Sequence, residues 1–391
     1  MRGSPMAYRL SSSKGVRMPF LPFTRPTIDE DTIQGVAEVL RSGWIASGPK
    51  VLEFEAALSG YVGGRAVRVM TSATEALEIA LRVCGVGPGD EVITPAMSFV
   101  ATANVICRVG AKPVFVDIDL ATRNVDLGKL EAAITPRTRA LMPVHFAGLP
   151  VDMDRLYDVA GRHRLRVVED AAHAIGSRWR GRAIGSFGDL VVFSFHPNKN
   201  ITSIEGGALV GAEGDELRDV ERHRFHGQTK DENGEAEVHF PGGKSNMPDV
   251  AARVGLGQLS HLEEFNARRR RLVARYFEKL KTDPAMLLPA PSDEGHSWHV
   301  FTPLLPLDRL KTTRPEFIRA MHERDIGVGV HYPAIHLFAH YRSLGFRDGD
   351  FPNAERVGRE TVTLPLFPRM SEGDVDRVCD AAASVLKAQK R

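Results

Sequence analysis

The 391-residue chain has little cysteine, almost no net charge and no long apolar run, and each shortage excludes a class of protein. Its three cysteines, Cys84, Cys107 and Cys379, are too few and too scattered for a disulfide framework or a cysteine-rich zinc site. Lysine and arginine number 51 against 49 aspartate and glutamate, so no global basic field attracts nucleic acid or an anionic membrane. No apolar run approaches the roughly 18 residues that span a bilayer. We expect a globular, cytoplasmic protein with no nucleic-acid or membrane partner.

The order of apolar patterns predicts two folded units after a tail. Residues 1–17 are basic and Ser-rich and lack an apolar core of signal-peptide length, so we expect a tail without function, disordered or vector-derived. Short apolar runs then alternate with helical patterns, which is typical of a mostly parallel sheet with helices on both faces. The pattern loosens after Gly255, where residues 256–280 predict one long charged helix. We predict a large domain over 18–255 and a smaller C-terminal α/β domain over 256–391. The strands are expected at 67–70, 91–95, 113–116, 140–144, 166–168 and 190–193.

The first motif that could carry chemistry is the small-residue turn at 71–74, between a predicted strand and a predicted helix. Ligands of open parallel sheets bind at the carboxyl ends of strands, where helix N-termini point inward. The hydroxyls and backbone N–H groups of Ser72, Ala73 and Thr74 suit a phosphate, and the helix dipole adds attraction. Serine and threonine are equally common as simple helix caps, and the turn alone favours that interpretation.

The second and third motifs supply a carboxylate and an amine. Asp170 ends a predicted buried strand, where a carboxylate is costly unless it is paired, so it either caps the next helix or binds a protonated ring nitrogen of a cofactor. Lys199 follows an apolar strand and precedes a glycine pair. Desolvation in such a pocket lowers a lysine's proton affinity and yields an amine nucleophile. A structural lysine paired with Glu205 or Asp189 is the simpler interpretation of the lysine alone.

The three motifs together match the needs of pyridoxal 5′-phosphate (PLP). A lysine forms the imine, an aspartate keeps the pyridine nitrogen protonated, and a small-residue turn holds the phosphate. Their order along the chain, turn then Asp170 then Lys199, is that of fold-type I PLP enzymes.

The chain resembles the DegT/DnrJ/StrS family of sugar aminotransferases from residue 21 to about residue 386. Within that family it is most similar to the branch of UDP-4-amino-4-deoxy-L-arabinose aminotransferases. The resemblance implies a fold-type I α/β transferase with a seven-stranded, mostly parallel sheet and a smaller C-terminal domain. The stretches that carry it are SGWIASGPKVLEFE at 42–55, TSATEAL at 71–77, GDEVITPAMSFVATAN at 89–104, PVHFAGLPVDM at 143–153, VVEDAAHAIGS at 167–177, FSFHPNKNITSIEGGALV at 193–210, VGLGQL at 254–259, IGVGVHYPAIHL at 326–337 and LPLFPRM at 364–370.

The resemblance also implies a role for each matching residue. Lys199 would form the aldimine and carry the proton, and Asp170 would pair with the pyridine nitrogen. His173 would approach the phenolic oxygen of the cofactor, and Phe99 would stack on its ring. The phosphate would be bound by Ser72, Ala73, Thr74 and Ser194.

The family completes each phosphate site with a residue of the neighbouring subunit, so the resemblance implies a homodimer with shared active sites. The relevant stretch is 243–249. Gly243 and Ser245 stand where many members have aromatic residues, which leaves open whether Lys244 or Asn246 makes the contact. The same comparison places His331 near the entrance for the sugar nucleotide. Trp44 either forms a wall of the substrate pocket, the interpretation we prefer, or packs the N-terminal helix.

The implied reaction transfers an amino group from L-glutamate to a nucleotide-linked keto sugar, with a 4-keto sugar preferred, for an aminosugar of lipopolysaccharide, O-antigen or a secondary metabolite. Dehydratase relatives replace the imine lysine with histidine, so the retained Lys199 favours transamination. The alternatives are a 3-keto sugar, a cyclitol such as an inosose, or a PLP-binding regulator without catalysis. No metal site is expected. His331, His336 and His340 lack a carboxylate pair, and Pro333 interrupts their helical spacing.

Overall fold

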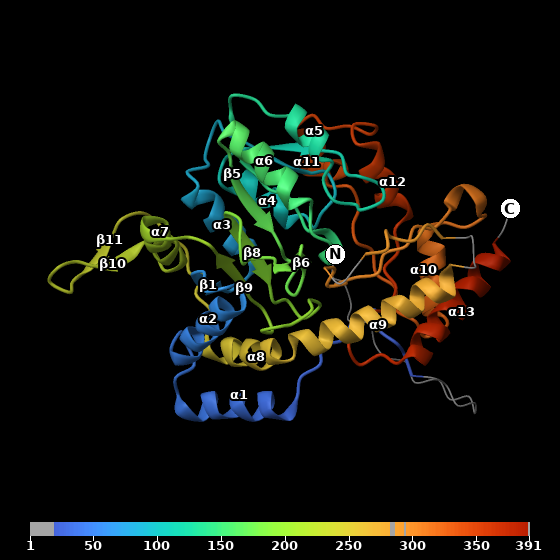
Figure 1. Ribbon diagram of the computed structural model, residues 1–391, viewed down its shortest axis with the longest axis horizontal. Coiled ribbons are helices and arrows are strands. Elements are labelled where there is room, and N and C mark those ends of the chain that lie inside the picture. The colour runs from blue at the N-terminus through green and yellow to red at the C-terminus, as the bar shows by residue number, and fades with distance from the viewer. Residues whose placement is uncertain (1–18, 282–285, 293–294, 390–391) are drawn as a thin grey trace, which may run out of the picture.

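The computed structural model describes residues 19–281, 286–292 and 295–389, so the tail predicted at 1–17 lies outside the described residues. A large unit built on a seven-stranded sheet and a smaller C-terminal unit lie side by side, and the helix α9 (Leu262–Leu280) runs from one to the other (Figure 1). No helix within these described ranges is long and apolar enough to cross a membrane.

The seven-stranded sheet has the order β1-β9-β8-β5-β4-β2-β3 and confirms the predicted α/β class. Its neighbours pair in parallel except at β9, which is antiparallel to both β1 and β8. The six predicted strands are present, and β9 is the strand that the pattern analysis did not predict. The strands are β1 (Val67–Met70), β2 (Glu91–Pro95), β3 (Lys112–Val116), β4 (Thr138–Leu141), β5 (Arg166–Asp170), β8 (Leu190–Ser194) and β9 (Gly207–Val210), with small hairpins formed by β6 (Arg178–Trp179) and β7 (Arg182–Ala183) and by β10 (Gln228–Lys230) and β11 (Ala236–Val238).

Helices cover both faces of this sheet. Because side chains alternate along a strand, Val167 of β5 joins the core beneath α2, α6 and α8, whereas Val168 joins the core beneath α3 and α4. The helices of this unit are α1 (Glu30–Ser42), α2 (Pro49–Tyr61), α3 (Ala73–Val83), α4 (Ala101–Arg108), α5 (Leu127–Ala132), α6 (Met153–His163), α7 (Gly214–Arg224) and α8 (Asp249–Ser260).

The smaller unit packs its own apolar core between the second half of α9 and the helices α10 (Arg314–His322) and α13 (Glu372–Ala388). The segment at Leu21 joins this core and forms a β-bridge to Ile326, so the start of the described chain packs against the smaller unit. The predicted domain boundary between residues 255 and 256 falls within α8. The division of the chain into two domains at that point stays a prediction. The helices α11 (Ala339–Ser343) and α12 (Pro352–Glu360) pack instead in a separate cluster that includes Phe115 of β3.

The single long helix predicted over 256–280 is wrong. The chain forms α8 and then α9, with a break at His261, whose φ of −99° and ψ of 0° leave the helical region. There the His261 ring reaches Asp29, the N-cap residue of α1, at 2.5 Å. This contact with a residue 232 positions away has no signature in the local helical pattern.

Candidate active site

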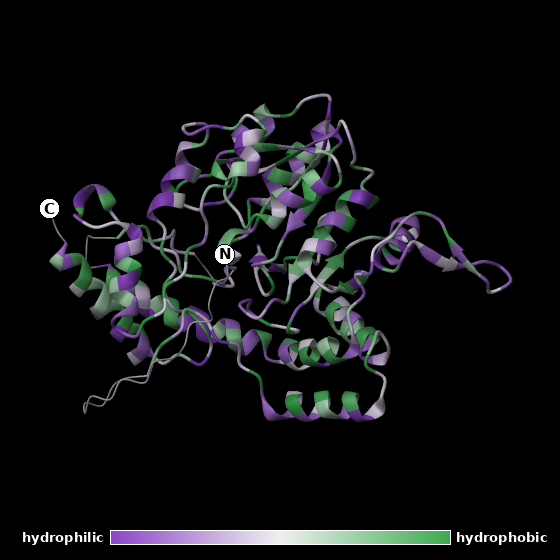
Figure 2. Ribbon diagram, turned by 180° about the vertical axis from the view of Figure 1, so that it is seen from behind, coloured by the Kyte–Doolittle hydropathy of each residue, from purple (hydrophilic) through white to green (hydrophobic). Residues whose placement is uncertain are grey.

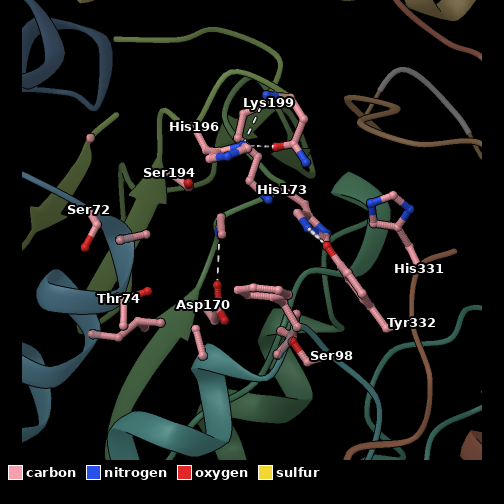
Figure 3. Close-up of a pocket in the computed structure, with 18 of the residues that line it drawn as sticks. Ser72, Thr74, Ser98, Asp170, His173, Ser194, His196, Lys199, His331 and Tyr332 are labelled. Atoms are coloured by element: carbon pink, nitrogen blue, oxygen red, sulfur yellow. Dashed lines mark hydrogen bonds between the residues drawn. The ribbon is translucent and has the colours of Figure 1, made fainter. Parts of the chain in front are cut away.

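A cavity of about 380 Å³ opens at the carboxyl ends of β5 and β8, where the first turn of α3 also lies (Figure 3). Its floor carries Asp170 at the end of β5 and Ser194 at the end of β8, because both side chains face the α3 side of the sheet. The opposite wall comes from His331 and Tyr332 of the smaller unit. The site therefore joins segments that lie far apart in the sequence, at the edge where parallel sheets bind ligands.

Asp170 is 5% exposed at the bottom of this cavity. The Thr102 hydroxyl donates to its Oδ2 at 2.7 Å, and the backbone N–H of Ala172 donates to its Oδ1 at 3.2 Å. Burial raises the pKa of Asp170, and these two hydrogen bonds and the nearby charge of Lys199 act against the rise. The residues that follow form turns, so Asp170 does not cap a helix and is free to meet a cationic ring nitrogen.

Lys199 lies on the loop after β8 and faces the same cavity. Burial lowers the pKa of its amine to about 8, and the charge of Asp170 opposes that decrease. The ion pairs that would make Lys199 structural are formed elsewhere, since Asp189 binds Arg166 at 2.7 Å and Glu205 lies 3.7 Å from His196. With this pKa, about a tenth of the amine is unprotonated at pH 7 and about half at pH 8, as a nucleophile requires.

Hydroxyl groups line the cavity where α3 begins. Ser72 caps α3 by accepting the backbone N–H of Glu75 at 3.1 Å, which confirms the capping interpretation, and it also lines the cavity with Ala73, Thr74 and Ser194. A Cβ on Gly207 would lie 2.4 Å from the Ala73 nitrogen, so the glycine lets β9 approach this turn closely. The helix N-terminus and the hydroxyls form a cradle that suits a phosphate.

His173 and Tyr332 form the third side of the site. The backbone N–H of Ala147 donates to His173 Nδ1 at 3.3 Å, so the ring proton lies on Nε2, 3.1 Å from the Tyr332 hydroxyl. Burial, with the nearby positive charge of Lys199, lowers the pKa of His173, and the ring is neutral. The ring of His299 packs against it, with centroids 4.4 Å apart.

Phe99 and His331 were also predicted to belong to the site, and both line the cavity. The Phe99 ring is 54% exposed and lies 5.9 Å from the Tyr332 ring, a position from which it can cover a flat ligand. His331 is fixed by a 2.7 Å hydrogen bond between its Nδ1 and Thr363 Oγ1.

Three predicted residues do not line this cavity within one chain. Trp44 is 61% exposed. Lys244 donates to the side-chain oxygen of Asn246, and Asn246 donates to the hydroxyl of Ser47. Their roles in binding stay predictions. Of the histidines considered for a metal, His336 binds Glu355 at 3.1 Å, and the described ranges contain no group of three metal-ligating side chains.

Sequence comparisons now decide the family. The sequence profile of the DegT/DnrJ/EryC1/StrS aminotransferase family matches residues 26–383. The chain belongs to this family. The spore coat polysaccharide biosynthesis protein SpsC of Bacillus subtilis (strain 168) is 42% identical over 383 residues, which cover 95% of this chain and 98% of SpsC.

Solved structures of family members superpose closely on this aminotransferase. The PMP form of Spr1654 from Streptococcus pneumoniae gives a TM-score of 0.89 at 35% identity, covering 95% of this chain and 99% of that chain. DesV of S. venezuelae, in complex with a ketimine intermediate, gives 0.87 at 34% identity and covers 95% of this chain and 99% of that chain. The fold is therefore that of fold-type I PLP enzymes, and PLP is the cofactor.

The residues of this chain fit that cofactor. The cavity is lined by a buried carboxylate, by a hydroxyl-bearing helix N-terminus and by an amine with a lowered pKa. Three further residues of the site, Ser98, Thr102 and Tyr332, were not predicted from the sequence. Ser98 and Thr102 follow the carboxyl end of β2, and hydroxyl residues at a strand end are a sequence signal that could have identified them. Tyr332 reaches the site from the other unit, and nothing in its local sequence distinguishes it from a core residue.

Proposed function

We propose that this sugar aminotransferase transfers an amino group from L-glutamate to the keto group of a nucleotide-linked sugar, with a 4-keto sugar as the preferred acceptor. The observation that carries the proposal is the amine of Lys199, which faces a cavity large enough for a flat cofactor and lies near Asp170. The printed description of SpsC, spore coat polysaccharide biosynthesis, supports an aminosugar product.

Each residue of the cavity contributes one step. PLP, when bound, supplies the electron sink that makes the carbon beside the amino group acidic. Lys199 would take that proton on its amine and deliver it to C4′ of the cofactor. Asp170 holds the proton of the ring nitrogen, and His173, neutral and with its proton on Nε2, donates a hydrogen bond toward an anionic ring oxygen. The hydroxyls around Ser72 and Ser194 hold the phosphate.

We further propose a homodimer in which the partner's 243–249 stretch completes each site. Exposed apolar side chains near the N-terminus support this association, because a monomer would leave them in water. Two of them belong to α1, which lies at the lower edge of Figures 1 and 2. These exposed side chains are Ile33, Leu40, Trp44, Ile45 and Leu52. Lys244 and Asn246 lie close to the same surface, because Asn246 bonds to Ser47.

Subunit complementation tests the shared site. Lys199→Ala removes the amine of its own site, and a Lys244→Ala/Asn246→Ala chain supplies no partner contact. In a mixed dimer, the site that keeps Lys199 receives an intact partner stretch, so mixing two inactive variants restores about a quarter of the activity. A mixture that stays inactive, although mixed dimers form, contradicts the shared site.

The acceptor is tested by following oxoglutarate release from L-glutamate with a panel of acceptors. UDP- and dTDP-linked 4-keto and 3-keto sugars are compared with a free inosose, and Lys199→Ala is the blank. We expect release with a nucleotide-linked 4-keto sugar. Turnover of the free cyclitol, with no affinity for either nucleotide, would overturn the proposed substrate class.

A further inference from the structure

Two hydroxyl groups form a line behind Asp170, away from the residues that hold the phosphate. Ser98 precedes α4 and Thr102 lies in its first turn. Ser98 Oγ is 2.8 Å from Thr102 Oγ1, and Thr102 Oγ1 is 2.7 Å from Asp170 Oδ2. All three side chains are buried, so bulk water does not compete for these contacts.

The number of protons fixes the direction of this line. An ionised carboxylate only accepts hydrogen bonds, so Thr102 donates its single hydroxyl proton to Asp170. The oxygen of Thr102 must then accept from Ser98, which donates. Each bond polarises the next in a water-poor site, and a bond to an ionised acceptor is stronger than one between neutral groups.

Asp170 needs such a donor because it shares one proton with the cofactor's ring nitrogen. The proton stays on the ring only while the carboxylate is the weaker base of the two, and burial works in the opposite direction by raising the pKa of Asp170. The backbone N–H of Ala172 satisfies one carboxylate oxygen, and Thr102 satisfies the other. The positive charge of Lys199 favours the ionised form as well.

We propose that Thr102, supported by Ser98, is a positioning residue that keeps the Asp170 carboxylate ionised and oriented, so that the proton shared with the cofactor stays on the ring nitrogen. The inference rests on the proposed role of Asp170. It adds to that role a reason for the two buried hydroxyls that stand in line behind Asp170.

Nitrogen-15 NMR of the protein loaded with PLP labelled at its ring nitrogen tests this directly, because the signal reports protonation of that nitrogen without any turnover. We expect a pyridinium signal in the wild type and in Thr102→Ser, which keeps the hydroxyl. Thr102→Val has nearly the same shape without the hydroxyl, and its signal should move toward that of neutral pyridine. Loss of a hydrogen bond to a charged group corresponds to about a tenfold or larger change in the proton equilibrium.

A matched control separates this effect from the loss of any buried hydroxyl. Thr94 is also buried and donates to the Met142 carbonyl at 2.9 Å instead of to Asp170, so Thr94→Val should keep the pyridinium signal. A wild-type signal in a cofactor-loaded Thr102→Val, or an equal shift in Thr94→Val, overturns the proposal. Should Thr102→Val fail to bind PLP, Ser98→Ala decides, since a smaller shift in the same direction supports the proposal and none overturns it. A neutral ring nitrogen in the wild type contradicts the role of Asp170 itself.

Discussion

Glu169 and Asp170 are adjacent carboxylic residues on β5, and they face opposite sides of the same sheet. Glu169 is fully buried on the α6 side, where the Tyr157 hydroxyl donates to its Oε1 at 2.6 Å and His145 Nε2 contacts its Oε2 at 2.9 Å. Asp170 faces the cavity on the α3 side. One strand therefore positions a carboxylate within the core and another at the ligand site.

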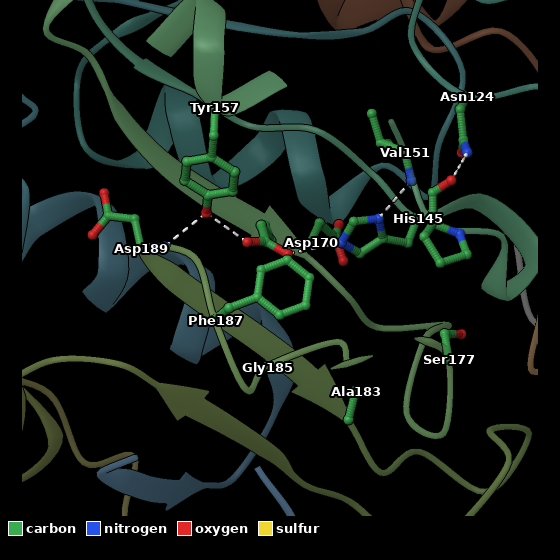
Figure 4. A network of polar contacts seen from close by, with 12 residues as sticks. Asn124, His145, Val151, Tyr157, Asp170, Ser177, Ala183, Gly185, Phe187 and Asp189 are labelled. Atoms are coloured by element: carbon green, nitrogen blue, oxygen red, sulfur yellow. Dashed lines mark hydrogen bonds and ion pairs between the residues drawn. The ribbon is translucent and has the colours of Figure 1, made fainter. Parts of the chain in front are cut away.

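The surroundings of Glu169 leave no room for a ligand. His145 accepts the backbone N–H of Val151 on Nδ1 at 3.1 Å, so its proton lies on Nε2 and is donated to Glu169 (Figure 4). Tyr157 also accepts the N–H of Asp189 at 2.7 Å. A Cβ on Gly188 would lie 2.4 Å from both the Glu169 carboxylate and the Tyr157 hydroxyl, so the loop packs directly onto this pair.

The comparison teaches that burial alone does not indicate the function of a carboxylate; whether the carboxylate borders a cavity does. Glu169 receives a side-chain donor on each oxygen from fixed core residues. Asp170 receives one side-chain donor and one backbone donor, and it borders a cavity that contains an amine. We therefore assign Glu169 to stability and Asp170 to the cofactor.

The largest expected effect comes from Asp170→Asn. An amide cannot hold a pyridinium proton as a carboxylate does, so we expect turnover to fall about 100-fold or more. The cofactor-free protein should fold normally, because the asparagine oxygen can accept the Ala172 N–H and its NH₂ can donate to the Thr102 hydroxyl, which can turn to donate to Ser98. Oxoglutarate release and chemical unfolding, measured on the same preparation, check both statements. Near-normal turnover contradicts the assignment.

The rate of PLP loading should depend on pH through Lys199. Only the unprotonated amine reacts, so the rate should rise about tenfold per pH unit at low pH and level off above the pKa. That pKa is about 8. Because the charge of Asp170 raises it, Asp170→Asn should lower the midpoint, whereas Glu169→Gln should leave it unchanged. Absorbance after mixing follows the reaction, and Lys199→Ala gives the baseline. A midpoint near the 10.5 of an ordinary lysine would show that the amine is not desolvated.

Glu169→Gln should reduce stability and spare the chemistry. Both carboxylate oxygens meet a donor, so the amide NH₂ of glutamine would face a donor in the core, and we expect the free energy of unfolding to fall by about 1–3 kcal/mol. Turnover per folded molecule should stay near that of the wild type. Denaturant unfolding measures the first quantity and oxoglutarate release the second. A large loss of turnover without loss of stability would reverse the comparison.

The smallest expected effect is that of Tyr157→Phe. The substitution keeps the ring and leaves the Asp189 N–H and one Glu169 oxygen without this partner, at a cost of about 1–2 kcal/mol in unfolding free energy. Combined with Glu169→Gln, it should lower stability by less than the sum of the two changes, because both remove the same contact. Fully additive effects would indicate that the two side chains act independently.

Much of the large unit could be predicted from the sequence, since strands such as β1 and β2 begin and end where their apolar runs do. Lys199 and Asp170 were also predicted, because strand-end residues in this class of sheet reach one edge. The features that were not predicted depend on contacts between distant segments. Strand β9 is an example, because its antiparallel direction follows from its pairing with β1 and β8.

Arg269 shows the same limit on the α9 side. The charge of the basic run at 268–271 is typical of a solvated helix face, yet the Arg269 side chain is buried and donates to the carbonyls of His299 and Leu366, both at 3.0 Å. Its spacing from Phe265 and Leu272 places it on the buried face of α9, so only its charge indicates a surface residue. Only the fold reveals that two backbone segments of the smaller unit pass over that position.

The central claim is that Asp170 serves the cofactor and Glu169 serves the fold. Its most direct test is the rise in unfolding temperature on adding PLP, compared among wild type, Asp170→Asn and Glu169→Gln. At a fixed concentration, a ligand that binds the folded protein more tightly stabilises it more. We predict that Glu169→Gln starts from a lower temperature and keeps the full rise, whereas Asp170→Asn starts near the wild type and loses most of it. The reverse assignment, with the rise lost in Glu169→Gln and kept in Asp170→Asn, would contradict the account.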